Sequence, residues 1–572
     1  MQKISKAKFR FTNAVIILIG ATLLVSCAGH HLGKNNSGEY RNGMVVSANH
    51  LASEVGVAIL KKGGNAVDAA VAVQFALAVV YPNAGNIGGG GFMVYRSAKG
   101  ETNTLDFREK GPAAANRDMY LDANGNPIVE KSLYGQLAAG VPGSVAGMEE
   151  AHQKYGKLKW ADLIEPAVRL AADGFKISAR QANELNGLKN RFTKLNPLGT
   201  ALINADKWAE GDVLTQKELS NTLALIKEHG RKGFYEGAVA DSIVAEMKRG
   251  GGIISKQDLI DYKAVWRKAV TGKYRGYDVI TMPPPSSGGI ALIQLLKSVE
   301  PYPLTKWGFN TDSTVQVMIE AERRVYADRA AHLGDPDFYP VPQDQLMEDS
   351  YIKQRMSTFN WQKASTSAEI SAGEVAPKEH EETTHFSIVD KEGNAVAITT
   401  TLNGSYGAGV VVKGAGFLLN NEMDDFSVKP GAPNMYGLVG GEANAIAPGK
   451  RMLSSMTPAI LAKDSDLFMV VGTPGGSTII TSVFQTILNV VDFNMSMQSA
   501  VAAKKFHHQW LPDDVAIEDK ALDSLTKVKL EAKGYKFVSR GSIGRVDAIL
   551  KTKWGYYQGG ADPRGDDKAV GW

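Results

Sequence analysis

Cysteine is almost absent from this sequence of 572 residues, in which Cys27 is the single example. One cysteine excludes disulfide bonds within the chain and leaves no thiol for chemistry elsewhere. No serine stands in a Gly-x-Ser-x-Gly elbow, so the sequence gives no support for an α/β-hydrolase nucleophile. The glycine run at 88–91 is not followed by Gly-Lys-Ser/Thr, which argues against a phosphate-binding loop. Such glycines more often let two backbones pass closely in a sheet core.

Excess charge is lacking too, once the start of the chain is set aside. The formal net charge is +4, and Lys3, Lys6, Lys8 and Arg10 account for it. The remainder is close to neutral, so there is no electrostatic argument for binding nucleic acid. The apolar content of 44% and charged content of 22% are typical of a soluble globular protein.

The first 26 residues have the pattern of an export signal. Their basic start precedes an apolar run of about twelve residues, too short to cross a bilayer core of about 30 Å. The run ends in the letters LVSCA, which resemble the bacterial lipobox. We therefore expect residues 1–26 to be a lipoprotein-type signal peptide and Cys27 to carry lipid on the periplasmic face of a membrane. Ala28 after the cysteine favours the outer membrane; an ordinary secretory signal is the alternative.

The junction at Thr383 carries the strongest local signal in the chain. Residues 362–382 are polar, without apolar periodicity, and are typical of a flexible linker. From Thr383 the sequence alternates as a β-strand, turns at 391–394 and continues as a second strand at 395–401. If the Glu382–Thr383 bond breaks, Thr383 carries both a nucleophilic hydroxyl and a free amine that can act as its base. The pattern alone also fits an ordinary Thr-rich hairpin.

Histidine spacing does not predict a metal site. His380 and His385 lie five residues apart rather than four, and they straddle the junction between loop and strand. His507 and His508 are expected to be packing residues. We therefore expect no metal and no cofactor.

Motifs on both sides of Thr383 form a family pattern. After the junction they are TTHFSIVDKEGNAVAITTTLNGSYGAG, LLNNEMDDFSVKPG, PNMYGLVGG, RMLSSMTPAI, GTPGGSTIITSVFQTILN and FHHQWLPD. Before it they are ANHLASEVGVAILKKGGNAVDAAVA, NAGNIGGGGFMVY and DFREKGPAAA. In this order and spacing, from about Met44 to the C-terminus, the chain resembles the γ-glutamyltranspeptidase family (γ-glutamyltransferase, glutathione hydrolase) of N-terminal nucleophile hydrolases.

The resemblance implies an α/β fold, a four-layer αββα sandwich, formed as one domain by two chains from a self-cleaved precursor. Residues 27–382 would be the large subunit, ending in the linker at 362–382. Residues 383–572 would be the small catalytic subunit, and the two would form a heterodimer.

The same resemblance implies roles for single residues. Thr383 would be the nucleophile, Thr401 would steady its hydroxyl, and the backbone of Gly475-Gly476 would receive the oxyanion. The substrate-binding residues implied by the motifs are Arg108, Ser454 and Ser455 for an α-carboxylate, Asn403, Glu422 and Asp425 for an α-ammonium, and Tyr436 in a lid loop at 430–441. A guanidinium suits a carboxylate because it binds both oxygens at once.

The implied activity is the cleavage of γ-glutamyl amides such as glutathione, through an ester on Thr383. Water, or an amino-acid or dipeptide acceptor, would resolve the ester. A glutaryl-cephalosporin acylase or a relative acting on poly-γ-glutamate is the alternative within the fold. Arg108, Glu422 and Asp425 together favour a free amino-acid head group over both. A distant alternative is an inactive surface-binding lipoprotein, which has no need of self-cleavage.

Overall fold

The structure is a computed structural model that describes residues 38–370, 383–432, 434 and 437–572. The chain divides into two units, Met1–Glu39 and Tyr40–Trp572, and the fold below is that of the second. Strand β1 (Glu39–Tyr40) lies at the boundary. The predictions for Cys27, Glu382 and Tyr436 lie outside the described residues.

The first large sheet mixes strands from before and after Thr383. Its order is β19 (Lys568–Gly571), β2 (Met44–Ser47), β10 (Thr384–Val389), β11 (Ala395–Thr401), β3 (Gly90–Arg96), β4 (Thr102–Asp106) and β7 (Val265–Arg267). All neighbouring pairs are antiparallel. The hairpin β10–β11 is therefore inserted between β2 and β3, with hydrogen bonds on both sides.

The second large sheet also combines strands from before and after Thr383, and its strand pairs given below are antiparallel. Within Tyr40–Trp572 its order is β18 (Tyr557–Ala561), β17 (Asp547–Lys551), β13 (Asp466–Gly472), β12 (Ala459–Lys463), β9 (Tyr277–Thr281) and β8 (Val270–Tyr274). Two small sheets contain β14 (Phe506–His507), β15 (Val515–Glu518) and β16 (Phe537–Arg540), and β5 (Phe175–Lys176) and β6 (Val213–Leu214).

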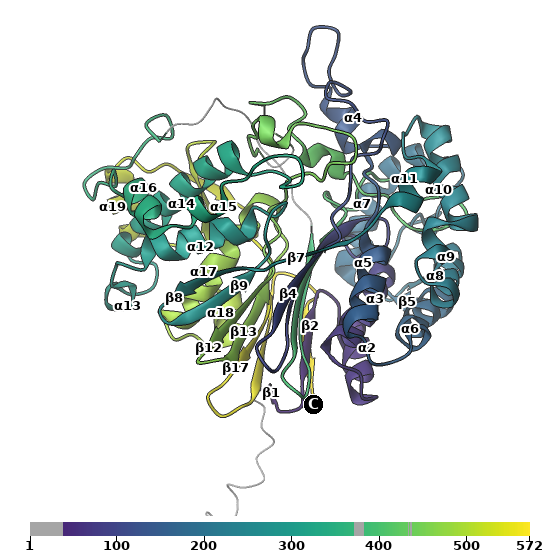
Figure 1. The fold of residues 1–572 in the computed structure, drawn as a ribbon, viewed down its shortest axis with the longest axis horizontal. Coiled ribbons are helices and arrows are strands. Elements are labelled where there is room, and N and C mark those ends of the chain that lie inside the picture. The colour runs from purple at the N-terminus through teal and green to yellow at the C-terminus, as the bar shows by residue number, and fades with distance from the viewer. Residues whose placement is uncertain (1–37, 371–382, 433, 435–436) are drawn as a thin grey trace, which may run out of the picture. The chain divides into compact units, whose positions relative to one another are not determined.

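Helices cover the outer face of each large sheet (Figure 1). On the first sheet lie α2 (His50–Lys61), α3 (Ala66–Val80), α5 (Ser144–Tyr155), α6 (Trp160–Asp173), α7 (Ala179–Leu195), α8 (Lys217–His229), α9 (Lys232–Tyr235), α10 (Gly237–Gly250) and α11 (Lys256–Asp261). On the second lie α12 (Gly288–Val299), α13 (Leu304–Trp307), α14 (Asp312–His332), α15 (Gln343–Leu346), α16 (Asp349–Met356), α17 (Ile479–Val491), α18 (Met497–Ala502) and α19 (Ser524–Ala532). Short turns complete the set: α4 (Val129–Leu133), η1 (Gln136–Ala138), η2 (Glu422–Asp425), η3 (Glu442–Asn444) and η4 (Gly476–Thr478).

Three apolar layers separate the four layers of secondary structure. Successive strand residues point to opposite faces, so Val45 packs under the helices of the first sheet while Val46 faces the second sheet. On the second sheet, Ile460 faces inward and Leu461 packs under the helices. Both faces of these strands are buried, which explains why they read as continuous apolar runs. The expected αββα sandwich is confirmed.

The predicted hairpin after Thr383 is confirmed, and helix α3 has a clear N-terminal cap. Asn65 caps α3 with a reciprocal capping box. Its side chain accepts from the backbone N–H of Asp68, and the Asp68 side chain accepts from the backbone N–H of Asn65. In the predicted hairpin, Thr384 pairs with Thr400, and Gly393 takes a φ of +93° in the turn. Residues 362–370 have neither helix nor strand, yet they are anchored: Ser365 N donates to Glu320 Oε1 over 3.1 Å.

Candidate active site

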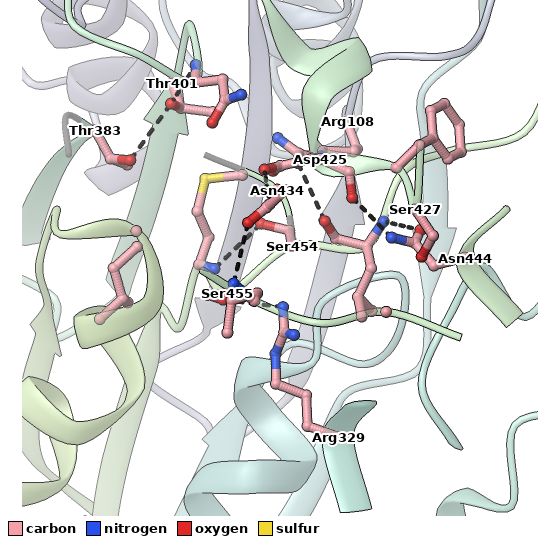
Figure 2. A pocket seen from close by; sticks show the side chains of 18 of the residues that line it. Arg108, Arg329, Thr383, Thr401, Asp425, Ser427, Asn434, Asn444, Ser454 and Ser455 are labelled. Atoms are coloured by element: carbon pink, nitrogen blue, oxygen red, sulfur yellow. Dashed lines mark hydrogen bonds and ion pairs between the residues drawn. The ribbon is translucent and has the colours of Figure 1, made fainter. Parts of the chain in front are cut away.

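Thr383 and Thr401 meet because of the strand register. Thr383 stands directly before β10 and Thr401 ends β11, so antiparallel pairing brings their Oγ1 atoms to 3.4 Å (Figure 2). Both side chains line one pocket. The N–H of Asn403 donates to Thr401 Oγ1 over 2.8 Å, which occupies a lone pair and favours a Thr401 hydroxyl that donates to Thr383. The Thr383 oxygen is thus oriented at the pocket wall.

The glycine run behind Thr401 is required for this close packing. A Cβ on Gly89 would lie 2.0 Å from the carbonyl oxygen of Thr401, and one on Gly88 would lie 2.1 Å from that of Leu418. Gly90 pairs with Thr401 across the β3–β11 ladder. The interpretation of the run as a site of close backbone approach is confirmed.

Asn403 follows Thr401 in a conformation that few side chains tolerate. Its φ is +72°, a region in which asparagine is less strained than most non-glycine residues. Its Nδ2 donates to the carbonyl oxygen of Asn421 over 3.0 Å, and its side chain lines the pocket with Thr401. The turn therefore ties the end of β11 to the segment that leads into η2.

Arg108 forms the centre of a buried charge cluster. Its Nη1 lies 2.5 Å from Glu422 Oε2, and its Nη2 contacts Asp425 Oδ2. Turn η2 presents both acids, and Glu109 adds a third carboxylate 3.5 Å from the guanidinium. The family resemblance implied that Arg108 and the two acids bind opposite ends of a substrate. In the structure, Arg108 is in direct contact with both acids.

Burial and mutual repulsion shift the pKa values in this cluster. Burial raises the pKa of Glu109 to about 8, against the opposing effect of Arg108. Burial also raises the pKa of Glu422 well above its ordinary value and raises that of Asp425. Within the described chain, Glu109 Oε1 and Glu422 Oε1 make no hydrogen bond. One guanidinium thus faces three carboxyl groups, and an added ammonium would relieve the cluster.

Ser454 and Ser455 face the pocket with their oxygens already used as acceptors. Met456 N donates to Ser454 Oγ, and Arg329 Nη2 donates to Ser455 Oγ, each over 3.1 Å. An oxygen that accepts in this way leaves its own O–H to donate. Both hydroxyls are therefore suited to an anionic group such as a carboxylate.

Arg329, on α14, is a pocket residue that the sequence analysis missed. It is 4% exposed, and its Nε donates to Ser287 Oγ over 2.9 Å. Burial lowers its pKa, with Tyr326 and Asp425 acting in the opposite direction. Its only sequence signal was a basic residue in the last turn of a helix, which is too common to suggest a site.

Gly475 and Gly476 adopt backbone conformations that favour glycine, with φ values of +136° and +49°. They begin η4, which runs directly into α17, and Gly476 lines the pocket. The N-terminal end of a helix stabilises negative charge, so this corner is suited to an oxyanion. The Tyr326 hydroxyl donates to the carbonyl oxygen of Ser477 and so fixes the turn from α14.

Comparison with known proteins decides the family. The family model for gamma-glutamyltranspeptidase matches residues 52–572. The chain belongs to this family. It is 47% identical over 535 residues to "Glutathione hydrolase proenzyme" of Escherichia coli (strain K12), covering 93% of this chain and 92% of that protein. It is 50% identical over 511 residues to the protein of the same name in Pseudomonas sp. (strain A14), covering 89% of each.

Solved structures agree with this assignment. A cephalosporin acylase from Bacillus halodurans superposes with a TM-score of 0.83 at 27% identity, over 95% of this chain and 98% of that one. The γ-glutamyltranspeptidase of Helicobacter pylori superposes with a TM-score of 0.56 at 46% identity, over 60% of this chain and 97% of that one. The αββα sandwich is thus that of the N-terminal nucleophile hydrolases.

The lid segment expected of this γ-glutamyltranspeptidase chain borders the pocket. Leu438, Val439 and Gly440 line it together with Asn434, whose Nδ2 donates to Asp425 Oδ1 over 3.2 Å. The segment therefore contacts the charge cluster directly. Tyr436 itself lies outside the described residues, and its role stays a prediction.

The histidine pair His507 and His508 is buried, as expected of packing residues. His507 Nδ1 lies 2.8 Å from Thr481 Oγ1. Across residues 38–370, 383–432, 434 and 437–572, no group of three or more His, Cys, Asp or Glu could hold a metal ion. His380 lies outside these ranges.

Proposed function

We propose that this protein cleaves γ-glutamyl amides such as glutathione through a γ-glutamyl ester on Thr383. One observation carries the proposal: the Thr383 hydroxyl shares a pocket with Arg108, Asp425 and the serine pair at 454–455. A γ-glutamyl group has a carboxylate and an ammonium on one carbon and its scissile carbonyl three bonds away. The pocket offers donors, acids and a nucleophile to these three groups. Relatives named glutathione hydrolase proenzyme point to the same substrate.

We further propose that the active form arises by cleavage of the Glu382–Thr383 bond. The Thr383 hydroxyl would attack the Glu382 carbonyl carbon, the peptide C–N bond would break as the amine leaves, and water would hydrolyse the resulting ester. The products are residues 27–382 and 383–572, which remain associated as large and small subunits. An α-amine ordinarily titrates near pH 8, close enough to neutrality for the new amine of Thr383 to accept the hydroxyl proton.

In the catalytic cycle, Thr383 Oγ1 attacks the γ-carbonyl carbon of the donor while the Thr383 amine accepts its proton. The backbone at Gly475 and Gly476 stabilises the oxyanion, and one such donor is worth about 3 kcal/mol of transition-state stabilisation. The leaving amine, cysteinylglycine when glutathione is the donor, takes the proton. Water then releases glutamate, or an amino-acid or dipeptide acceptor takes the γ-glutamyl group. Thr401 holds the nucleophile in line. No metal or organic cofactor takes part.

Recognition of the head group rests on charge. Ser454, Ser455 and the Arg108 guanidinium provide donors for the α-carboxylate. Asp425 and Glu422, with Asn403, provide oxygens for the α-ammonium. Burial raises the pKa of both acids, and an ammonium bound beside them would favour their charged forms. The lid segment with Tyr436 would close over the bound donor.

The direct test is turnover of glutathione by the purified protein, with and without glycylglycine as acceptor. We expect glutamate without the acceptor and γ-glutamyl-glycylglycine with it, and neither product from Thr383→Ala. Correctly folded wild-type protein that releases no glutamate from glutathione would overturn the proposal.

A glutaryl-type acylase is the second candidate, favoured by the superposition with the Bacillus halodurans cephalosporin acylase. A glutaryl group carries a carboxylate but no ammonium. It would leave Asp425, which lines the pocket, and its neighbour Glu422 without a cationic ligand beyond Arg108. We therefore rank this activity second. The rates at which the purified protein cleaves glutaryl and γ-glutamyl anilides would test this ranking.

We also propose export to the periplasmic face of a bacterial membrane, with Cys27 as a lipid anchor, most consistent with the outer membrane. The lipobox-like sequence before Ala28 supports this. In the part of the chain that the structure describes, no helix has the length and apolarity needed to cross a membrane. Two acyl chains suffice to hold a globular domain at a membrane surface.

A further inference from the structure

Arg329 differs from the other charged residues of the pocket in its partners. Arg108 is paired with Glu422 and Asp425, and Glu109 is close by. Arg329 bonds two hydroxyls instead, those of Ser287 and Ser455. Among the described residues, no carboxylate forms an ion pair with it. Asp425 acts on it only at longer range and is already paired with Arg108. A buried guanidinium without a contacting counter-ion is costly, which makes this position a candidate for a ligand anion.

The contacts of Arg329 converge on the serine pair. Its Nε donates to Ser287 Oγ, and the Ser287 hydroxyl in turn donates to the Ser454 carbonyl oxygen over 2.7 Å. Its Nη2 donates to Ser455 Oγ over 3.1 Å. One side chain therefore fixes the backbone of Ser454 and the hydroxyl of Ser455. Figure 2 shows Arg329 reaching the serine pair from the side away from Thr383.

This contact sets the direction of the Ser455 hydrogen bond. Because the Ser455 oxygen accepts from a guanidinium, its own proton is directed elsewhere, and the side chain lines the pocket. Met456 N donates to the Ser454 oxygen in the same way, so the Ser454 O–H is also left to donate. Without Arg329, the Ser455 hydroxyl could accept as well as donate and would lose its preference for an anion.

We propose that Arg329 is a positioning residue for the substrate carboxylate. It holds Ser455 as a hydrogen-bond donor and adds the positive charge that Arg108, already paired with acids, supplies only in part. The inference rests on the proposed γ-glutamyl function and extends its binding site to α14. Arg329 and Ser287 precede Thr383 while Ser454 and Ser455 follow it, so both pieces of the chain build the subsite.

The test is the binding of L-glutamate and of 4-aminobutyrate to the purified mature protein by calorimetry. The second ligand is L-glutamate without its α-carboxylate, and neither has a scissile amide. We expect Arg329→Gln to weaken L-glutamate at least about tenfold and 4-aminobutyrate less than about twofold. Arg329→Lys should lie in between, since one ammonium cannot reproduce the paired N–H geometry. Ser455→Ala combined with Arg329→Gln should cost less than the two single effects together.

Arg324→Gln is the matched control, because Arg324 is a buried arginine on the same helix that pairs with Glu320 and does not line the pocket. It should lower thermal stability and leave the ratio of the two ligand affinities unchanged. If Arg329→Gln weakens both ligands equally, or behaves as Arg324→Gln does, the role is structural and the inference is wrong. Wild-type protein that binds both ligands equally would also overturn it. Failure of the proposed function is a separate result, read from glutathione turnover.

Discussion

The Oγ1 atoms of Thr383 and Thr401 lie 3.4 Å apart, although 18 residues separate them in sequence. The β10–β11 register fixes this distance, and the Gly88–Gly91 run allows β3 to press against the Thr401 backbone. The proposed nucleophile is thus placed by sheet geometry rather than by a loop. Sites built on regular elements are held more rigidly than sites on loops.

Thr383→Ala should remain a single chain, because the hydroxyl that attacks the Glu382–Thr383 bond is gone. Wild-type protein should give fragments of about 38 and about 20 kDa on a denaturing gel, from scaling 61.4 kDa over 572 residues. Thr383→Ser keeps a hydroxyl and should still divide, which controls for folding. Division of Thr383→Ala at the same bond would mean that an outside protease makes the cut.

Asp425→Ala should reduce kcat/KM for glutathione by roughly 10²-fold or more, because loss of a buried charge partner typically costs 3–5 kcal/mol. Arg108→Ala should have an effect of similar size, and both variants should still mature. The control is Glu442→Ala, which removes a carboxylate from an exposed ion pair with Arg117. Glutaryl anilides should be poor donors for the wild type and less poor, relatively, for Asp425→Ala. Equal cleavage of glutaryl and γ-glutamyl anilides by the wild type would favour the acylase.

Acid should destabilise the protein partly through buried histidines. Burial lowers the pKa of His385 to about 3, against about 6.5 in an unfolded chain. The unfolded state therefore binds the proton first. The stability from His385 is complete above pH 6.5 and is lost as the pH falls toward 3. Each such histidine contributes a slope of about 1.4 kcal/mol per pH unit in this window.

His385→Gln should flatten the dependence of the unfolding free energy on pH between 6.5 and 4, measured by urea titration. His229 is about half exposed, and His229→Gln is the control that should leave the slope unchanged. Parallel slopes in wild type and His385→Gln would show that His385 is not buried in its neutral form.

Gly89→Ala should impair folding and maturation, since a Cβ there would lie 2.0 Å from the Thr401 carbonyl oxygen. Gly187→Ala is the counterpart: no atom lies within 4 Å of a Cβ at this exposed position of α7. It should stabilise the protein by about 0.5–1 kcal/mol, because alanine loses less backbone entropy in a helix. Thermal denaturation and gel analysis of the two variants measure both effects. Normal maturation of Gly89→Ala would contradict the tight packing behind Thr401.

Cys27→Ala, expressed in a bacterial host that processes lipoproteins, should convert a detergent-extracted protein into a soluble or unprocessed one. The reason is that no other cysteine is available to carry lipid. Mass spectrometry of the wild-type N-terminal peptide would identify the modification. Recovery of all wild-type protein in a detergent-free periplasmic extract would rule out the anchor.

Much of the fold was predictable because local signals and tertiary contacts agree. Asn65 is a good helix cap in any context, and the turn at Gly393 follows from its sequence alone. Thr383 could be proposed as the nucleophile because a polar stretch meets an alternating strand there. The αββα arrangement came from family resemblance, since alternation in β10 and β11 does not say which strands flank them.

The other features of the site could not be predicted, because they depend on contacts between segments that are distant in the sequence. Arg329 lies in a helix whose pattern has no unusual feature, and only the approach of residues 454–455 makes it a pocket residue. The pairing of Arg108 with Glu422 and Asp425 was equally hidden, because it joins positions more than 300 apart. The family motifs grouped these three residues as substrate-binding, which stays a prediction, but could not show that they touch each other before any substrate arrives.

The interleaving of strands in the first sheet has a consequence for the lifetime of the protein. Hairpin β10–β11 lies between β2 and β3, and the proposed cleavage at Glu382–Thr383 would leave every one of these ladders intact. Before the cut, folding is unimolecular, because one continuous chain supplies all seven strands. After it, an unfolded molecule can recover only by a bimolecular encounter of two fragments that lack complete sheets of their own. Such processing would turn a reversible folding reaction into one that each molecule completes once, and the cleaved protein would then persist because it unfolds slowly.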